Sequence, residues 1–363
     1  MNGHRRMRRC WLAGAFLLIL PIGGCAGIGP PVLERDHLDY AHAITDTQKQ
    51  QTLMNIVRLR YADVPAFLSI NQVVSNHTLE GEATASANIF PHAKTSTFGW
   101  PTGTVRYTDN PIITFSPVTG ARLAGSLARP LTPGELFPLA QNGLPIDVLL
   151  RLGVQSIGNL RNTGRLENTY VAPGSQSGSP GFFRLLAGLR TLQDKGGLNF
   201  RFSSDKSGLR VYFSISDGAG LKAVAAEVRS LLGMRAHEVE IVYGRTALGP
   251  NKIPILTRSF LGVLAHISGQ IDVPDADIEA QRTLASIHYA DGEQKPVIVV
   301  RAAQFKPSDA FAAIRYRGQW FWVSDSDFDS KVAFSVVQIL NAIAQGEAAD
   351  ESKAPILSIS TGR

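Results

Sequence analysis

The sequence predicts an α+β fold, in which mixed or antiparallel sheets pack against helices. Segments with the spacing of amphipathic helices, about 3.6 residues per turn, stand between short apolar runs that are typical of strands. These runs come singly or in hairpins rather than in a regular strand–helix–strand order, which favours α+β over a parallel α/β sheet. Of the 363 residues 44% are hydrophobic and 18% charged, a composition that can bury a core.

Residues 1–24 have the parts of a cleaved signal peptide in the usual order. Four basic residues come first: Arg5, Arg6, Arg8 and Arg9. An apolar run of ten residues follows, from Trp11 to Leu20. This run is too short to span a bilayer, which takes about 20 residues, so it is typical of an exported chain.

Cys25 follows a short stretch of small residues, "IGG", and this arrangement resembles the lipobox of bacterial lipoproteins. The resemblance implies cleavage before Cys25, a diacylglyceryl group on its thiol and an acyl chain such as palmitate on its amine. In the lipoproteins that this arrangement resembles, a residue such as Ala26 in place of aspartate implies the outer membrane, with the folded part on the periplasmic face. A plain signal peptide, or a short membrane anchor that happens to contain a cysteine, is the alternative. Arg8-Arg9 leaves open whether export is Sec-dependent or twin-arginine.

Cleavage changes what charge and cysteine content imply. The formal charge is +6, and removal of the four arginines leaves +2, so we expect no nucleic-acid partner. Cys10 is lost with the signal peptide and Cys25 is acylated, so the mature chain has no disulfide and no cysteine nucleophile or metal ligand.

Residues 25–44 are interpreted as a spacer after the lipidated cysteine, and residues 45–168 as an N-terminal α+β region. A helix is expected from Thr45, where Thr45-x-x-Gln48 matches a capping box. Its apolar face comprises Leu53, Ile56, Val57 and Tyr61. Pro65 ends it, a strand is expected over 66–74, and strands with long turns over 80–115.

Residues 117–143 return to a helical pattern, with a capping box and a proline at the first helical position in Thr132-Pro133-Gly134-Glu135. The run "IDVLLRLGVQSI", residues 146–157, is expected as a buried strand, with a helix as the alternative. The polar tract 169–181 is a loop or a linker, and whether it separates two domains is left open.

Residues 182–363 are interpreted as a C-terminal α+β region. A helix is expected from Ser179-Pro180 to Leu192, and another after Asp217 as its cap. Strands are expected over 198–203, 209–216, 238–244, 296–302 and 355–360, with helices over 257–269 and 330–345 and a hairpin over 311–324.

Two stretches resemble a known family. They are "NIVRLRYADVPAFL" at 55–68, called the first block below, and "RYRGQWFWVSDSDFDSKVAF" at 315–334, called the second block. Both are similar to an uncharacterised family of predicted bacterial outer-membrane lipoproteins, and the likeness extends over most of the mature chain. It implies a lipoprotein, but no reaction, cofactor or catalytic residue.

The second block predicts a candidate binding surface. If Arg317-Gly318 is a two-residue turn, Ile314 pairs with Phe321 on an apolar face. The opposite face then carries Arg315, Trp320 and Trp322, the residue types that partner and sugar-binding surfaces use. The alternatives are a helix that covers this face, which makes the tryptophans core residues, and a different turn length.

No catalytic residue, cofactor or metal is predicted with any specificity. Asp325, Asp327 and Asp329 form a weak calcium candidate, because the EF-hand positions for glycine and glutamate hold Ser330 and Val336. Asp329 or Ser330 is expected instead to cap the helix that follows. His237-Glu238 begins like a zinc-protease helix, but the position of the second histidine ligand is Ile241.

Three functions follow from these observations. The first is a membrane-anchored binding or assembly component that docks on an envelope protein or on cell-wall polymer. The second is a polysaccharide- or peptidoglycan-binding lipoprotein that uses the tryptophan hairpin. The third is an envelope hydrolase whose carboxylates are scattered in the sequence.

Overall fold

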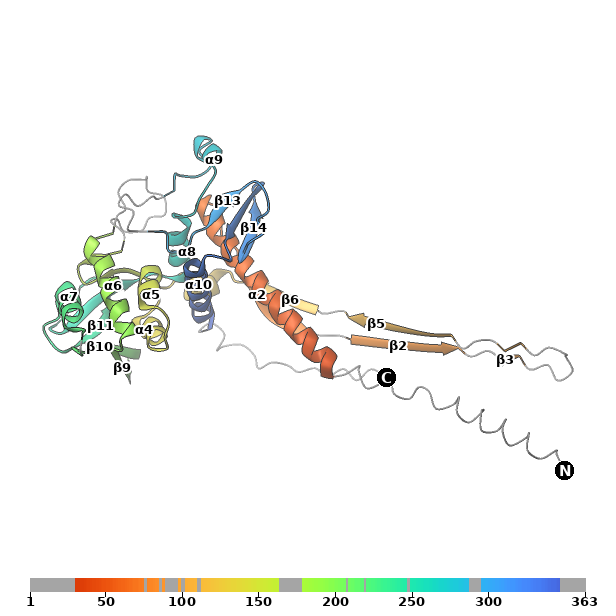
Figure 1. Cartoon of the computed structure of the whole chain (residues 1–363), viewed down its shortest axis with the longest axis horizontal. Helices are drawn as coiled ribbons and strands as arrows, with labels where there is room; N and C mark the ends of the chain where they lie inside the picture. The colour runs from red at the N-terminus through yellow and green to blue at the C-terminus, as the bar shows by residue number, and fades with distance from the viewer. Residues whose placement is uncertain are drawn as a thin grey trace, which may run out of the picture.

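A computed structural model describes residues 30–74, 77–84, 87–88, 97–98, 102–109, 112–162, 178–206, 208–218, 220–246, 249–286 and 295–346. The fold is α+β, as predicted, with a mixed six-stranded sheet, a three-stranded antiparallel sheet and helices packed against them (Figure 1). Residues 1–24, Cys25, most of the tract 169–181 and the expected strand 355–360 lie outside the described residues.

Helix α2, Pro30–Arg60, is the longest element of the part that the structure describes, and its N-terminal half extends away from the body (Figure 1). It begins at Pro30 rather than at the expected Thr45, so most of the expected spacer is helical. The Thr45 hydroxyl does not cap a helix; it donates to the carbonyl of Ala41 one turn back, at 2.8 Å. The predicted apolar face is confirmed, because Leu53, Ile56, Val57 and Tyr61 are at most 4% exposed.

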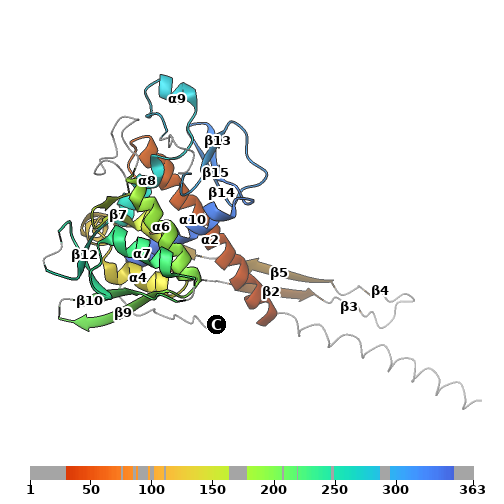
Figure 2. The ribbon, with the colours of Figure 1, turned by 60° about the vertical axis from the view of Figure 1, so that its left-hand side comes forward.

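Three strand pairs follow α2, and they confirm the strands predicted over 66–74 and 80–115. They are β1 (Leu68–Val74) with β6 (Ile112–Pro117), β2 (His77–Thr84) with β5 (Thr102–Asp109), and β3 (Ala87–Asn88) with β4 (Thr97–Phe98). Figures 1 and 2 show that together they form a long two-stranded ribbon, which projects on the same side as the N-terminal half of α2.

The next elements are α3 (Gly120–Arg122), the π-helix η3 (Leu123–Leu127), α4 (Pro133–Gln141), α5 (Ile146–Gly153), β7 (Val154–Ile157) and β8 (Leu160–Arg161). The capping box of α4 is confirmed, because the Glu135 carboxylate accepts a hydrogen bond from the Thr132 backbone N–H at 2.5 Å. The expected strand over 146–157 is wrong for its first eight residues, which form α5. The buried Ile146, Leu149 and Leu150 recur at helical spacing, which fits the alternative.

The six-stranded sheet has the order β8-β7-β12-β11-β10-β9. It adds β9 (Leu198–Asp205), β10 (Gly208–Ile215), β11 (Glu238–Tyr243) and β12 (Lys252–Thr257), with α6 (Pro180–Asp194) and α7 (Lys222–Leu232) packed together. The predicted pairing of β9 with β10 is confirmed, whereas β12 was not anticipated. Asp217 does not cap α7, which begins after Leu221; its carboxylate lies 2.6 Å from the Arg229 guanidinium.

The C-terminal part holds α8 (Phe260–Ser268), α9 (Asp275–Glu279), β13 (Arg301–Ala303), β14 (Ala312–Tyr316), β15 (Gln319–Val323) and α10 (Phe328–Gly346). The three-stranded sheet has the order β13-β15-β14, so β14 is an edge strand. Helix α2 packs against both α8 and β14, and α10 against α5 and α8. Among the described residues, no helix has the length and apolar character that crossing a membrane requires.

Candidate functional site

The first and second blocks meet in the fold, at the junction between the C-terminal end of α2 and the three-stranded sheet. The ring of Tyr61 lies 5.4 Å from that of Tyr316 and 6.2 Å from that of Phe321, measured between centroids. The Arg317 guanidinium lies 5.3 Å from the centre of the Tyr61 ring and 3.2 Å from the Asp63 carboxylate. Residues about 250 positions apart in sequence therefore form one packed junction.

The β14–β15 hairpin has the register that the sequence predicts. Ile314 pairs with Phe321, and the turn residues Arg317 and Gly318 have φ angles of 47° and 85°. Positive φ at both central residues is the mark of a type I′ turn, whose twist matches that of the two strands. Ile314 and Phe321 are buried, so this face of the hairpin joins the core.

The opposite face of the sheet, called the outer face below, brings the three predicted binding residues together. Arg315 pairs with Trp320, and Trp322 lies between Ala313 of β14 and Arg301 of β13. Arg315 is exposed, and both tryptophans are half-buried. The covering-helix alternative requires both tryptophans to be core residues. Their partial exposure does not fit that alternative.

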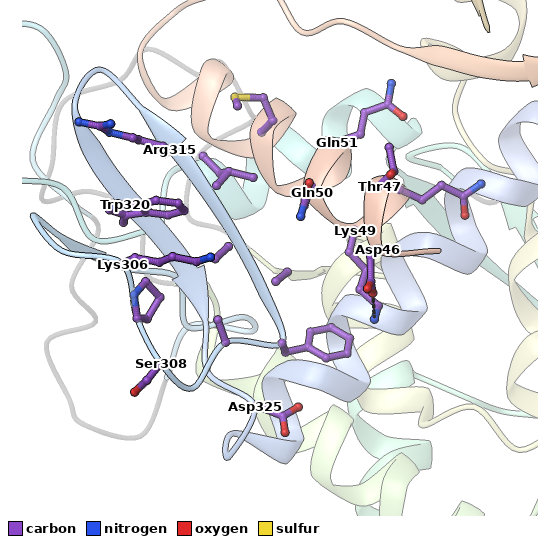
Figure 3. A pocket seen from close by; sticks show the side chains of 18 of the residues that line it. Asp46, Thr47, Lys49, Gln50, Gln51, Lys306, Ser308, Arg315, Trp320 and Asp325 are labelled. Atoms are coloured by element: carbon purple, nitrogen blue, oxygen red, sulfur yellow. Dashed lines mark hydrogen bonds and ion pairs between the residues drawn. The ribbon is translucent and has the colours of Figure 1, made fainter. Parts of the chain in front are cut away.

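A groove of about 980 Å³ runs between α2 and the edge strand β14, and we call it the β14 groove. Figure 3 shows Lys49, Gln50 and Gln51 of α2 on one side of it and Arg315 and Trp320 on the other. Both faces of β14 contribute to the lining, so the groove follows the edge of the sheet rather than lying over one face.

The charges in the β14 groove do not balance. Asp46 is paired with Lys49 at 3.0 Å, and Asp325 is paired with Lys331 at 2.7 Å. Lys306 lies 5.7 Å from the centre of the Trp320 ring. Neither Lys306 nor Arg315 has a carboxylate partner among the described residues, so this end of the groove has an excess of positive charge.

The three aspartates of the second block have separate roles. Asp327 caps α10, because its carboxylate accepts from the Ser330 N–H at 3.1 Å and from the Ser330 hydroxyl at 2.7 Å. The cap is thus Asp327 rather than the expected Asp329 or Ser330, and Asp329 lies in the first turn. Asp325 forms an ion pair with Lys331, so the three carboxylates do not converge on one point. The described residues contain no cluster of three metal-ligating side chains.

A polar cluster that no sequence pattern predicts lies beside the junction, and its members Tyr61 and Asp277 are buried. The Tyr61 hydroxyl donates to the Asp277 carboxylate at 2.7 Å, and Arg282 lies 2.9 Å from the same carboxylate. Burial, together with the hydrogen bond to Asp277 and the charge of that carboxylate, raises the pKa of Tyr61. Burial opposes ionisation of Asp277, but its bonds from Tyr61 and Arg282 outweigh this and lower its pKa.

Arg60 ties the same end of α2 to the loop around α9. Its guanidinium donates to the carbonyls of Gly269 at 3.3 Å and Leu284 at 2.7 Å, and burial lowers its pKa. A cavity of about 480 Å³ lies beside it. The signal for these contacts was Arg60-Tyr61 in the first block, but the spacing of the block does not reveal its partners.

A second buried cationic group lies outside the junction. Arg258 is fully buried and donates to the carbonyls of Arg151, Leu152 and Val154 at the end of α5. Carbonyl oxygens at a helix C-terminus favour a cation. Next to it, burial and the charges of Arg258 and Arg151 hold the pKa of His266 well below its usual value.

Comparison with known proteins finds no matching family model, curated protein or solved structure. The likeness of the two blocks to bacterial outer-membrane lipoproteins therefore stays a prediction.

Proposed function

We propose that this chain is a lipoprotein anchored to the periplasmic face of the bacterial outer membrane by acyl chains on Cys25, and that it acts by binding a protein of the cell envelope rather than by catalysis. The order of basic residues, apolar run, small residues and Cys25 supports the anchor. Several acyl chains, at about 0.8 kcal/mol per buried methylene, hold a protein firmly at a membrane.

The β14 groove is the observation that carries the binding function. It lies between α2 and the edge strand β14, and it holds two cations, Lys306 and Arg315, without carboxylate partners among the described residues. Its volume of about 980 Å³ is at the upper end of the range for small-molecule pockets, about 300–1,000 Å³. An edge strand beside a large groove is typical of sites that take part of another protein.

Site-specific photocrosslinking in living cells tests the binding function. A photoreactive residue at Gln50, an exposed position in the groove, should give a discrete adduct with an envelope protein. The matched control is Ser203, an exposed position on the edge strand β9 of the other sheet, where we expect no such adduct. No adduct at Gln50, or the same adducts at both positions, would refute a groove-specific partner.

The anchor has its own test. The Cys25→Ser variant should leave the outer-membrane fraction, and mass spectrometry of the native protein should find an acylated N-terminal cysteine. If the variant stays in the membrane fraction and the native protein carries no acyl group, the lipoprotein assignment is wrong.

A second candidate function, binding of peptidoglycan or another envelope polysaccharide, is favoured by the outer face. Half-buried tryptophans beside Arg301 and Arg315 are suited to stack on sugar rings and to pair with sugar carboxylates. Co-sedimentation with purified peptidoglycan tests this function. Changing Trp320 and Trp322 to alanine should abolish sedimentation without loss of the folded state, whereas unchanged sedimentation would exclude this face.

A further inference from the structure

We infer that the β14 groove binds its partner as an added β-strand, and that the bound segment is extended and alternates acidic with apolar side chains. This inference rests on the proposed protein-binding function and names the chemistry of the partner. Three features carry it: the backbone of β14, the two sides of the groove and the charge of the outer face.

The backbone of β14 has a free edge. A two-residue turn closes on a hydrogen-bonded pair, here Tyr316 with Gln319, and hydrogen-bonded pairs alternate along an antiparallel ladder. Ala312 and Ile314 therefore bond to β15, whereas the N–H and C=O groups of Ala313 and Arg315 point away from it. No described strand pairs with that edge, so these groups are available to an extended segment.

The edge of β14 has the length for such a segment. The five residues of β14 extend over about 17 Å, since a strand rises about 3.3 Å per residue. Near its start the small side chains of Ala310, Ala312 and Ala313 line the groove, together with the larger Phe311, whose ring centre lies 4.6 Å from Lys49 Nζ. A neighbouring strand can therefore approach β14 closely at Ala313, beyond Phe311.

The two sides of the groove select different side chains. A strand added to β14 continues the alternation of the sheet, so its side chains point in turn to the inner and the outer face. On the inner side they meet Met54 of α2, Ile314 and Leu68, and Leu68 is 47% exposed although it is apolar. Apolar side chains at alternate positions of the bound segment would cover this surface.

On the outer side the same segment meets Arg315 and Lys306, which lack carboxylate partners among the described residues. The acids of the groove, Asp46 and Asp325, are already paired with Lys49 and Lys331. Carboxylates at the outward positions would balance this charge, and positive side chains there would be repelled. The bound segment therefore reads acid–apolar–acid along the edge.

Isothermal titration of the full mature protein in detergent with synthetic peptides tests the inference. The probe is a capped seven-residue peptide of alternating glutamate and valine. We expect it to bind, and we expect the matching peptide of lysine and valine to bind at least about tenfold more weakly. The Arg315→Glu variant should reduce this preference or reverse it. An acidic peptide methylated at alternate backbone nitrogens, on the edge that would face β14, should not bind.

Two proline variants provide a matched pair. Ala313→Pro removes an N–H that points to the free edge and should abolish binding, while an unchanged circular dichroism spectrum and an unchanged urea midpoint show that the protein keeps its fold. Ser204→Pro changes an equivalent position on the edge strand β9, where Ser204 lies opposite Leu209, and should leave binding unchanged.

Other outcomes would overturn the inference. Equal binding of the methylated peptide would exclude strand addition, and equal or no binding of the acidic and basic peptides would exclude the alternating chemistry. If Ala313→Cys forms a disulfide between two copies, a second copy of this chain occupies the edge. If it forms one within a chain with Ser358→Cys, a position in the expected strand 355–360, the C-terminal segment of the same chain occupies it. In each case a specific adduct at Gln50 with an envelope protein would still support the proposed function, so the two failures are distinguishable.

Discussion

Removal of the Tyr61 hydroxyl is the most specific test of how the junction between the two blocks contributes to stability. In Tyr61→Phe the ring keeps its contacts with Tyr316 and Phe321, and only the 2.7 Å hydrogen bond to Asp277 is lost. A hydrogen bond to a charged group contributes about 1.5–3 kcal/mol. Because Asp277 is buried but keeps Arg282 at 2.9 Å, we expect the lower part of this range, about 1.5–2 kcal/mol.

Urea unfolding of wild type and variant measures this difference, and its pH dependence identifies the cause. The pKa of Asp277 is lowered in the folded state, so its stabilising bonds are present above the ordinary carboxyl pKa of 3.8 and are lost as the pH falls through the folded value. The difference between Tyr61→Phe and wild type should therefore be constant from neutral pH down to about pH 5 and shrink below pH 3.8.

Two results would refute this reasoning. A difference below about 0.5 kcal/mol at neutral pH would mean that the bond to Asp277 does not hold the junction together. A difference that persists in the Asp277→Ala background, which has no acceptor at this position, would show that the hydroxyl acts through another partner. As a comparison, Tyr61→Ala also removes the ring, and loss of a large buried aromatic residue costs about 3–5 kcal/mol.

Three further predictions concern the rest of the fold. His266 is held neutral while the unfolded chain binds a proton, so stability should fall by about 2 kcal/mol between pH 7 and pH 5, and His266→Gln should lack this loss in urea unfolding. In Gly188→Ala the new Cβ would lie 2.5 Å from a methyl group of Val228, so we expect the free energy of unfolding to fall by about 1–3 kcal/mol in the same assay. An unchanged free energy would mean that α6 and α7 are less closely packed. Gly318→Ala places an alanine at φ 85° in the hairpin turn and should lower stability by about 1 kcal/mol, with no steric clash to relieve; an unchanged melting temperature would contradict the type I′ turn.

The features that the sequence predicted correctly depend on neighbours within a few positions. The hairpin register follows from Arg317-Gly318 and the alternation on either side of it. The capping box at Thr132 and the buried face of α2 follow from spacings of three and four residues. The box motif at Thr45 predicts a helix start there, but it lies inside the longer helix α2, where the Thr45 hydroxyl donates to the Ala41 carbonyl instead.

What the tertiary structure decided depends on contacts between distant segments. The partners of Tyr61 and Arg60 are more than 200 positions away, and no local pattern predicts such contacts. Strand β12 was missed because it is defined by β11 and β7 beside it, and its length alone does not distinguish it. The β14 groove arises only because α2 lies beside an edge strand.

The sequence by itself determined the α+β class, the hairpin and the residues of its outer face. Through Cys25 it also predicts the localisation at the outer membrane. Only the tertiary structure brought the two blocks together and placed Lys306 and Arg315, which have no carboxylate partner among the described residues, beside an edge of β14 that no described strand covers. The reason is physical: periodicity and turn chemistry act over a few residues, whereas a binding groove is made by surfaces that folding brings together.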